Sequence, residues 1–257
     1  MGEEAQGLLG VVEKPTTLDY RSRNLYRALL IVSGLLNILF LLLGIISWTH
    51  HPPSYENGFT LDLEAIEAPV KAEIEVIEKV YGGGVNLNSE GEFVADEEGH
   101  EYIGPPSKKV DDAWNRLLEG TNIDVSPDEA DLSASTFRWP ESGLYFTGLE
   151  VYHSLHCLNR LRQALYPDHY DHVFDSPSHP SRLDHISHCV NHIRQALQCH
   201  ADLTPMEWRL DGSKVIVKTN TRHTCRNWDK INDWATARRT KFESIESWKN
   251  GSLVVVD

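Results

Sequence analysis

The stretch HSLHCLNRLRQAL, residues 153–165, recurs 32 residues later as HISHCVNHIRQAL, residues 185–197. Over the last ten positions of the two copies, seven residues are identical and two more are conservatively exchanged. Apolar residues recur in both copies with the period of an amphipathic helix, which predicts helices over residues 148–166 and 183–199. Pro167 ends the first of them, because proline cannot continue a helix. The sequence therefore predicts a domain that contains a duplicated helix.

Each copy begins with the pentad H-x-x-H-C, in which two histidines and a cysteine are spaced at i, i+3 and i+4. A helix turns by about 100° per residue, so these three side chains share one face. Two facing helices of this kind bring four imidazoles to one point, and imidazole is a common metal ligand. The residues expected to hold a metal ion are His153, His156, His185 and His188. Histidines of the core or the surface are the alternative, which is weaker for a duplicated motif.

A second feature changes the class of the protein: residues 28–48, ALLIVSGLLNILFLLLGIISW, contain no charged side chain. At about 1.5 Å per residue this segment matches the roughly 30 Å hydrocarbon core of a bilayer. No small-x-small cleavage site follows, which favours a signal anchor over a cleaved signal peptide. Arg21, Arg23 and Arg27 precede the span, whereas the first basic residue after it is Lys71. The positive-inside rule predicts a single-pass protein with residues 1–27 in the cytosol and the remainder in the secretory lumen.

All four cysteines follow the predicted span, and their oxidation state decides which donors are left for a metal. In the oxidising lumen, cysteines on facing helices pair readily. Among the three possible connectivities we expect the bridges Cys157–Cys189 and Cys199–Cys225. The histidines then supply the ligands, which favours copper, with iron or zinc as alternatives. In a reducing compartment the same residues would favour a Cys/His zinc site.

Two further histidines are candidates for the neighbourhood of the metal. His192 lies at i+7 from His185 on the same stripe, where the first copy has Arg160 instead. It is either a ligand, a partner that orients a ligand, or a plain surface histidine. His223 stands two residues before Cys225, so the second bridge would bring it near the site as the best fifth ligand.

The rest of the chain predicts a mainly α fold with few short strands. Helices are expected over residues 107–119, stopped by Gly120, and over 229–239, with a short strand over 215–217. Residues 49–106 have the character of a stem, although apolar residues between Leu61 and Val80 recur at roughly helical spacing. The predicted packed domain therefore comprises residues 107–257.

Three other side chains have expected roles. Arg162 and Arg194 occupy equivalent positions of the repeat and point away from the first histidine of each pentad, so we expect them to bond to neighbouring segments. Asn250 begins the triplet Asn-Gly-Ser, a candidate glycosylation site if it is lumenal.

Charge and missing motifs exclude several classes of function. The formal net charge is -14, so the average field repels polyanions and a nucleic-acid partner is not expected. The chain has no G-x-G-x-x-G, Walker, G-x-S-x-G or H-E-x-x-H motif, which leaves nucleotide-binding, serine-hydrolase and zincin chemistry without support.

Three stretches together resemble the fungal UstYa-like family: EVYHSLHCLNRLRQALYP (150–167), HISHCVNHIRQALQCHADLTP (185–205) and HTCRNWDKINDW (223–234). The resemblance covers about residues 108–240, and it is specific because the spacing and flanks of the double pentad agree with the N-terminal span.

This resemblance implies an oxidase of a fungal secondary-metabolite pathway. Members act in oxidative macrocyclisation of ribosomal peptides such as ustiloxin- and phomopsin-like toxins, and others in hydroxylation or chlorination. The pentad histidines would be the catalytic metal site, with a peptide or small metabolite as substrate and with a second copy or a second family member as a possible partner. The rival hypothesis is a non-catalytic lumenal scaffold stiffened by a closed zinc site.

Overall fold

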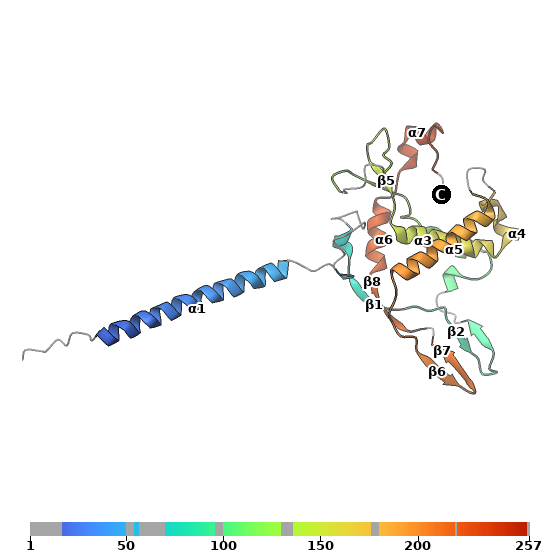
Figure 1. Ribbon diagram of the computed structural model, residues 1–257. Coiled ribbons are helices and arrows are strands. Elements are labelled where there is room, and N and C mark those ends of the chain that lie inside the picture. The colour runs from blue at the N-terminus through green and yellow to red at the C-terminus, as the bar shows by residue number, and fades with distance from the viewer. Residues whose placement is uncertain are drawn as a thin grey trace, which may run out of the picture. The chain divides into compact units, whose positions relative to one another are not determined.

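The computed structural model describes residues 17–49, 54–56, 70–95, 100–129, 136–175, 180–218 and 220–255 (Figure 1). The chain divides into two compact units, Met1–Pro52 and Pro53–Asp257. Each unit is described by itself below.

The first unit contains the helix α1, Thr17–Thr49. Within it, Tyr20–Ser47 is long and apolar enough to cross a membrane. The helix begins well before the predicted start at residue 28, because the arginine-rich turns that precede the span are good helix formers. A helix that is apolar all round is either buried or a membrane span, and the described side chains of α1 are exposed. The orientation in a membrane stays a prediction.

The second unit contains more helix than strand, which agrees in part with the mainly α fold predicted from the sequence. Its α-helices are α2 (Lys108–Leu117), α3 (Glu150–Ala164), α4 (Pro167–Tyr170), α5 (Arg182–Cys199), α6 (Trp228–Ala237) and α7 (Glu246–Lys249). Single turns of 3-10 helix are η1 (Lys71–Glu73), η2 (His100–Tyr102), η3 (Asp171–Val173) and η4 (Phe242–Ser244). The four helices predicted in this unit are confirmed to within a few residues at their ends.

The strands pair two by two into antiparallel ribbons. These are β1 (Val76–Val80) with β8 (Arg222–Arg226), β2 (Val85–Leu87) with β3 (Phe93–Ala95), β4 (Ile123–Val125) with β5 (Tyr145–Thr147), and β6 (Trp208–Asp211) with β7 (Lys214–Val217). The predicted strand at 215–217 is confirmed as part of β7. Apolar residues recur at helical spacing up to Val80, but residues 76–80 form strand β1 and no helix. Most of that pattern, residues 57–69, lies outside the described residues. Pairing with β8 ties this part of the predicted stem to the domain.

The core forms where α3 and α6 pack against β4. Tyr152 on α3 is fully buried in a cluster with Ile123, Val125, Trp234 and Ala235. Gly120 permits this packing, because a Cβ there would lie 2.6 Å from the Tyr152 hydroxyl and 2.8 Å from the Ala235 Cβ. The hydroxyl donates a 2.7 Å hydrogen bond to Asn232 Oδ1, so this buried polar group is satisfied. The core thereby fixes α3, which carries the first pentad.

Arg162 ties the outer side of α3 to two other helices. Its guanidinium donates 3.0 Å hydrogen bonds to Asp111 Oδ1 on α2 and to the hydroxyl of Tyr170 on α4. Tyr170 in turn donates to the same carboxylate oxygen at 2.6 Å. The expectation that Arg162 bonds to neighbouring segments is confirmed. Arg194 differs, since its bonds go to Asn191 and Gln198 of its own helix.

Candidate metal centre

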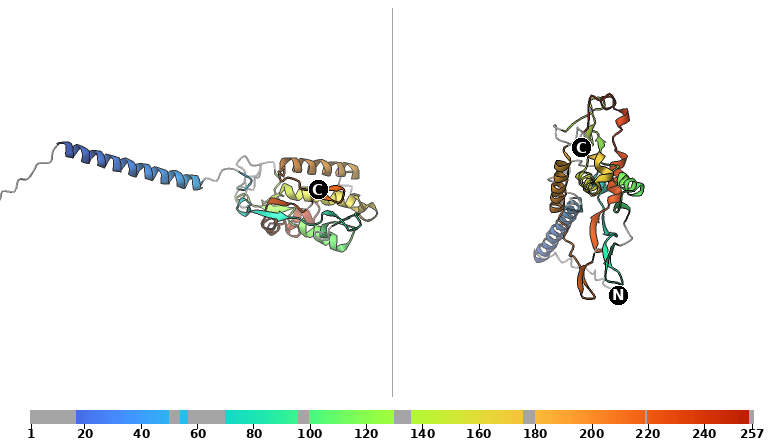
Figure 2. Two further views of the ribbon diagram at one scale, coloured as in Figure 1. Left: turned by 90° about the horizontal axis from the view of Figure 1, so that it is seen from below. Right: turned by 90° about the vertical axis from the view of Figure 1, so that its right-hand side faces the viewer.

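Helices α3 and α5 lie side by side (Figure 2) and bring the two pentads together. His153 of the first pentad meets His188 of the second, and His156 meets His185. A step of three residues toward the C-terminus of α3 is thus matched by an equal step toward the N-terminus of α5. The two helices are antiparallel, so the first histidine of each copy faces the second histidine of the other.

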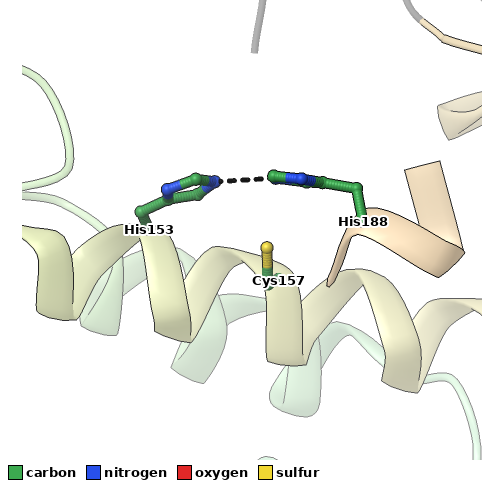
Figure 3. Close-up of side chains that lie close together, drawn as sticks. All are labelled: His153, Cys157 and His188. Carbon is green, nitrogen blue, oxygen red and sulfur yellow. Dashed lines mark hydrogen bonds between the residues drawn. The ribbon is translucent and has the colours of Figure 1, made fainter. Parts of the chain in front are cut away.

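His153 and His188 form the closest pair (Figure 3). Their Nε2 atoms are 3.3 Å apart, with the ring centroids at 5.4 Å. Two nitrogens bound tetrahedrally to one ion at about 2.0–2.1 Å lie about 3.3–3.4 Å from each other. The observed separation therefore equals the spacing of two ligands on one metal ion. Cys157 lies below the pair in Figure 3, and the ligand atoms of the three residues fall within 4.8 Å of one another.

Glu150 and His192 extend this cluster along the same face. A carboxylate oxygen of Glu150, a ring nitrogen of His192 and a ring nitrogen of His153 all lie within 4.8 Å of one another. Glu150 Oε2 is 3.7 Å from both His153 Nδ1 and His192 Nε2. The rings of His153 and His192 have centroids 3.9 Å apart, and Ser154 Oγ is 3.1 Å from His192 Nε2. Two candidate ligand groups thus share His153.

Burial lowers the pKa of His192 below its ordinary value, and the neighbouring His153 adds to this effect while Glu150 opposes it. A lowered pKa keeps the imidazole neutral at neutral pH. Neutral imidazole is the form that binds a metal ion. His192 is therefore part of the cluster in position and in protonation state, whereas the sequence left open whether it was a surface histidine.

His156 and His185 form a second, deeper pair. They are 9% and 4% exposed, their ring centroids are 6.1 Å apart, and the ring planes are inclined by 20°. Phe174 packs edge-on against His185 at 6.0 Å. Neither residue belongs to the ligand groups within 4.8 Å found in the described part of the chain. The structure arranges the four pentad histidines as an accessible pair and a buried pair, and their convergence on one ion stays a prediction.

The cysteines of the pentads are both buried between the helices and the core. The antiparallel register places Cys157 beyond one end of the two histidine pairs and Cys189 beyond the other end. The two cysteines are therefore offset along the helix axes by five residues, or about 7.5 Å. A disulfide needs Cα atoms within about 7 Å of each other. No disulfide bond joins any two of the four cysteines in the structure. Both bridges stay predictions, and the register argues against the one between Cys157 and Cys189.

His223, expected as a fifth ligand, lies elsewhere on β8. Its Nδ1 is 2.7 Å from Asp202 Oδ2, and it belongs to neither ligand group. Hydrogen bonds from Thr204, followed by the one from His223, lower the pKa of Asp202 to about 2. His223 is therefore paired with a carboxylate and contributes nothing to the helix-pair cluster in this structure.

Glu150 is the residue that sequence reasoning missed. It precedes His153 by three positions, so helical periodicity places it on the histidine face, and that spacing was the available signal. At the other end of the domain, Asn250 is exposed and its Oδ1 accepts a 2.9 Å hydrogen bond from the backbone of Ser252. Its glycosylation stays a prediction.

Comparison with known proteins gives a family match over most of the chain. A family model described as "Mycotoxin biosynthesis protein UstYa" matches residues 16–238. The UstYa family oxidase phomYd of Diaporthe leptostromiformis is 32% identical over 246 residues, covering 86% of this chain and 79% of its own. The UstYa family oxidase phomYc' of the same fungus is 41% identical over 143 residues, covering 53% and 51%. Hydroxylase cctR of Talaromyces islandicus is 28% identical over 142 residues, covering 53% and 52%.

These matches confirm the resemblance seen in the double pentad. Its extent was underestimated, because the family match begins at residue 16 and includes the apolar helix as well as the helix pair. No solved structure gives a significant match to the chain.

Proposed function

This chain belongs to the UstYa family of mycotoxin biosynthesis proteins, and we propose that it is a membrane-anchored, metal-dependent oxidase of a fungal secondary-metabolite pathway. Relatives named as oxidases support the oxidoreductase class. The observation that carries the metal proposal is the 3.3 Å separation of His153 Nε2 and His188 Nε2 across two helices.

The donor set fits a redox metal at the accessible end of the helix pair. His153 and His188 would be its central ligands, with Cys157 in the same ligand group, while Glu150 and His192 form a second group with His153. His156 and His185, the buried pair, are the other two proposed ligands. Copper is the proposed metal because imidazole-rich sites suit it, with iron or zinc as alternatives. A redox metal here supplies the one-electron chemistry that oxidation of an unreactive C–H or phenol O–H bond requires.

The protein side chains position the metal and the substrate. The Glu150 carboxylate lies 3.7 Å from His153 Nδ1, where its charge favours the present orientation of the ring. Ser154 Oγ lies 3.1 Å from His192 Nε2, and this hydrogen bond orients the second ring. Because Glu150 and His188 are exposed, the accessible pair opens to solvent and admits a substrate. His156 and His185 are buried from water, and Phe174 packs on His185.

The proposed substrate is a peptide or another small metabolite, with O2 or peroxide as the electron acceptor. Oxidative cyclisation of a ribosomal peptide is the leading reaction. Hydroxylation is the second candidate, because one relative is named a hydroxylase. Comparing the metabolites of a producing strain with and without this gene separates the two. Loss of a cross-linked product would support cyclisation, and loss of a hydroxylated product would support hydroxylation.

The proposed anchor is α1, with the domain in the lumen of the secretory pathway. Its apolar stretch is long enough to span a bilayer, and basic residues precede it. We expect a C-terminal tag to be protected from protease in sealed microsomes and digested once detergent is added. Digestion without detergent would contradict the lumenal placement and the predicted disulfides with it.

A spectroscopic experiment separates an oxidase from a scaffold with a closed zinc site. After loading with copper, the full chain in detergent should give a Cu(II) electron paramagnetic resonance signal that azide shifts reversibly. A redox-silent ion that azide does not reach would favour the scaffold. A His188→Ala variant, which removes one ligand from α5, is the matched control and should lose the azide-sensitive signal.

A further inference from the structure

The β6–β7 ribbon exposes an apolar face that no described part of the domain covers. Trp208 pairs with Val217 and Leu210 pairs with Val215 in its register, so all four side chains project from the same face. Trp208, Leu210 and Val215 are 60%, 73% and 64% exposed. The two residues Leu203 and Met206, in the segment that leads into β6, are at least as exposed as the ribbon's tryptophan.

The opposite face of the ribbon carries Arg209, Ile216 and Lys214, and its two cations are already bonded. Arg209 donates to Asn86 Oδ1 at 3.3 Å, and Lys214 donates to the carbonyl of Gly91 at 2.7 Å. The Lys214 ammonium also lies 5.3 Å from the ring centroid of Phe93. Hydrogen bonds therefore hold this face to the β2–β3 hairpin, and the face that carries Trp208, Leu210 and Val215 is the exposed one. In a ribbon that contributes to the core of a soluble domain, the apolar face is buried and the polar face is exposed to water.

The composition of the exposed face matches a membrane interface better than a protein partner. Tryptophan is enriched where the bilayer meets water, and Trp208 lies on this face. A standard protein interface uses about 20–30 residues a side, far more than this ribbon presents.

The segment that follows α1 in the sequence is tied to β8, the strand that comes after the ribbon. Tyr55 accepts two hydrogen bonds from Arg226. Arg226 Nε donates to the backbone carbonyl of Tyr55 at 3.1 Å, and the backbone N–H of Arg226 donates to the Tyr55 hydroxyl at 3.0 Å. Tyr55 is thereby tied to β8, the strand that follows the ribbon. Tyr55 comes only six residues after the end of α1 at Thr49 in the sequence.

We propose that the apolar face of the β6–β7 ribbon inserts into the interfacial region of a lipid bilayer. The inference rests on the proposed anchoring of α1. Trp208 and Leu210 enter the boundary between headgroups and acyl chains, while Arg209 and Lys214 on the opposite face keep their bonds to the β2–β3 hairpin. The domain then has a second contact with the membrane, which restricts its rotation about the tether.

The test uses quenching of tryptophan fluorescence by brominated lipid. The full chain carrying Trp48→Phe, which removes the tryptophan of the span, is reconstituted into phosphatidylcholine vesicles with brominated acyl chains. We expect its emission to be quenched relative to unbrominated vesicles. The added change Trp208→Phe should abolish the quenching. The matched control Trp248→Phe, in α7, should leave it unchanged, because Trp248 packs on Phe242 at 4.6 Å and lies far along the chain from the ribbon.

Three results would overturn the inference. Quenching that survives Trp208→Phe, or no quenching in the Trp48→Phe chain, means that the face does not touch acyl chains. Trp208 emission that ignores bromine but changes with protein density in the vesicles means that a second copy covers the face. Flotation of the vesicles distinguishes failure of the anchor: a chain that does not float overturns both proposals, whereas a floating chain without quenching overturns this one alone.

Discussion

Helices α3 and α5 carry nearly the same sequence, yet the domain holds them in different ways. On α3 the side chains of Tyr152 and Arg162 are buried against the core and against α2 and α4. On α5 the equivalent arginine, Arg194, is exposed and bonds only within its own helix. The outer face of α5 also leaves three apolar residues exposed at seven-residue intervals, Leu183, Val190 and Leu197.

What the two helices share is the face that they turn toward each other. Both pentads place their histidines and a buried cysteine along the contact, and the antiparallel register pairs unlike histidines of the two copies. The repeated sequence therefore determines the face that carries the candidate metal ligands. The segments packed around each helix determine how far its other faces are buried. In this account α3 is the fixed half of the centre and α5 is the half that is held mainly through α3.

The largest effect is expected from breaking the shared face. If the centre is one unit, His153→Ala on α3 alone should abolish product formation as completely as His153→Ala combined with His185→Ala. Residues that act as a unit are strongly non-additive, because the first loss already removes the function. Product formation from the pathway substrate is the measurement. Partial and multiplicative losses would mean that the two helices carry separate sites.

The next effect tests the difference in anchoring. Arg162→Ala leaves a partly buried Asp111 carboxylate and the Tyr170 hydroxyl without their cation, which should cost about 2–3 kcal/mol of unfolding free energy. Arg194→Ala, the equivalent change on α5, should stay within about 0.5 kcal/mol. Urea unfolding of the full chain in detergent measures both. Equal losses would show that α3 is no better anchored than α5.

A smaller effect separates the two helices at the metal. His192 on α5 lies in a ligand group, whereas its equivalent on α3, Arg160, bonds to Gln163 of its own helix. We expect His192→Ala to weaken metal binding by about 10–100-fold, as is usual for residues that orient ligands. Arg160→Ala should leave the metal affinity unchanged. Titration with a competing chelator gives both values, and unchanged affinity in the His192 variant would remove this residue from the centre.

The smallest effect sharpens the anchoring comparison further. Asn159 and Asn191 accept hydrogen bonds from the arginine three residues on, at 2.9 Å and 3.2 Å. Only on α3 does that arginine reach other helices, so Asn159→Ala should cost about 1 kcal/mol of unfolding free energy. Asn191→Ala, on the exposed face of α5, should cost less than about 0.5 kcal/mol. Urea unfolding that ranks them in the opposite order would count against the comparison.

Local pattern was enough to predict the helices and the shared face of each pentad. Amphipathic spacing and Pro167 set the ends of α3, and the i, i+3, i+4 spacing placed the two histidines and the cysteine of each copy together. These features depend on neighbours within a few residues. The same is true of Glu150, whose i−3 position relative to His153 was visible in the sequence although it was not used.

The missed features depend on contacts between distant segments. Which histidine faces which is set by the register of α3 against α5, and that register also keeps Cys157 away from Cys189. Residues 76–80 form a strand because β8, almost 150 residues later, offers a partner. Arg162 and Arg194 have the same local sequence, and only the presence of α2 beside α3 buries the first of them.

Metal content tests the central claim most directly, that α3 and α5 hold one ion between them. The full chain is purified after copper loading and desalting, and the ratio of metal to protein is measured for the wild type, His153→Ala and His188→Ala. The account predicts one tightly bound ion per chain in the wild type and almost none after either substitution, since each removes a ligand from the pair that is 3.3 Å apart. Full metal content in both variants, or two ions of which each substitution removes one, would contradict it.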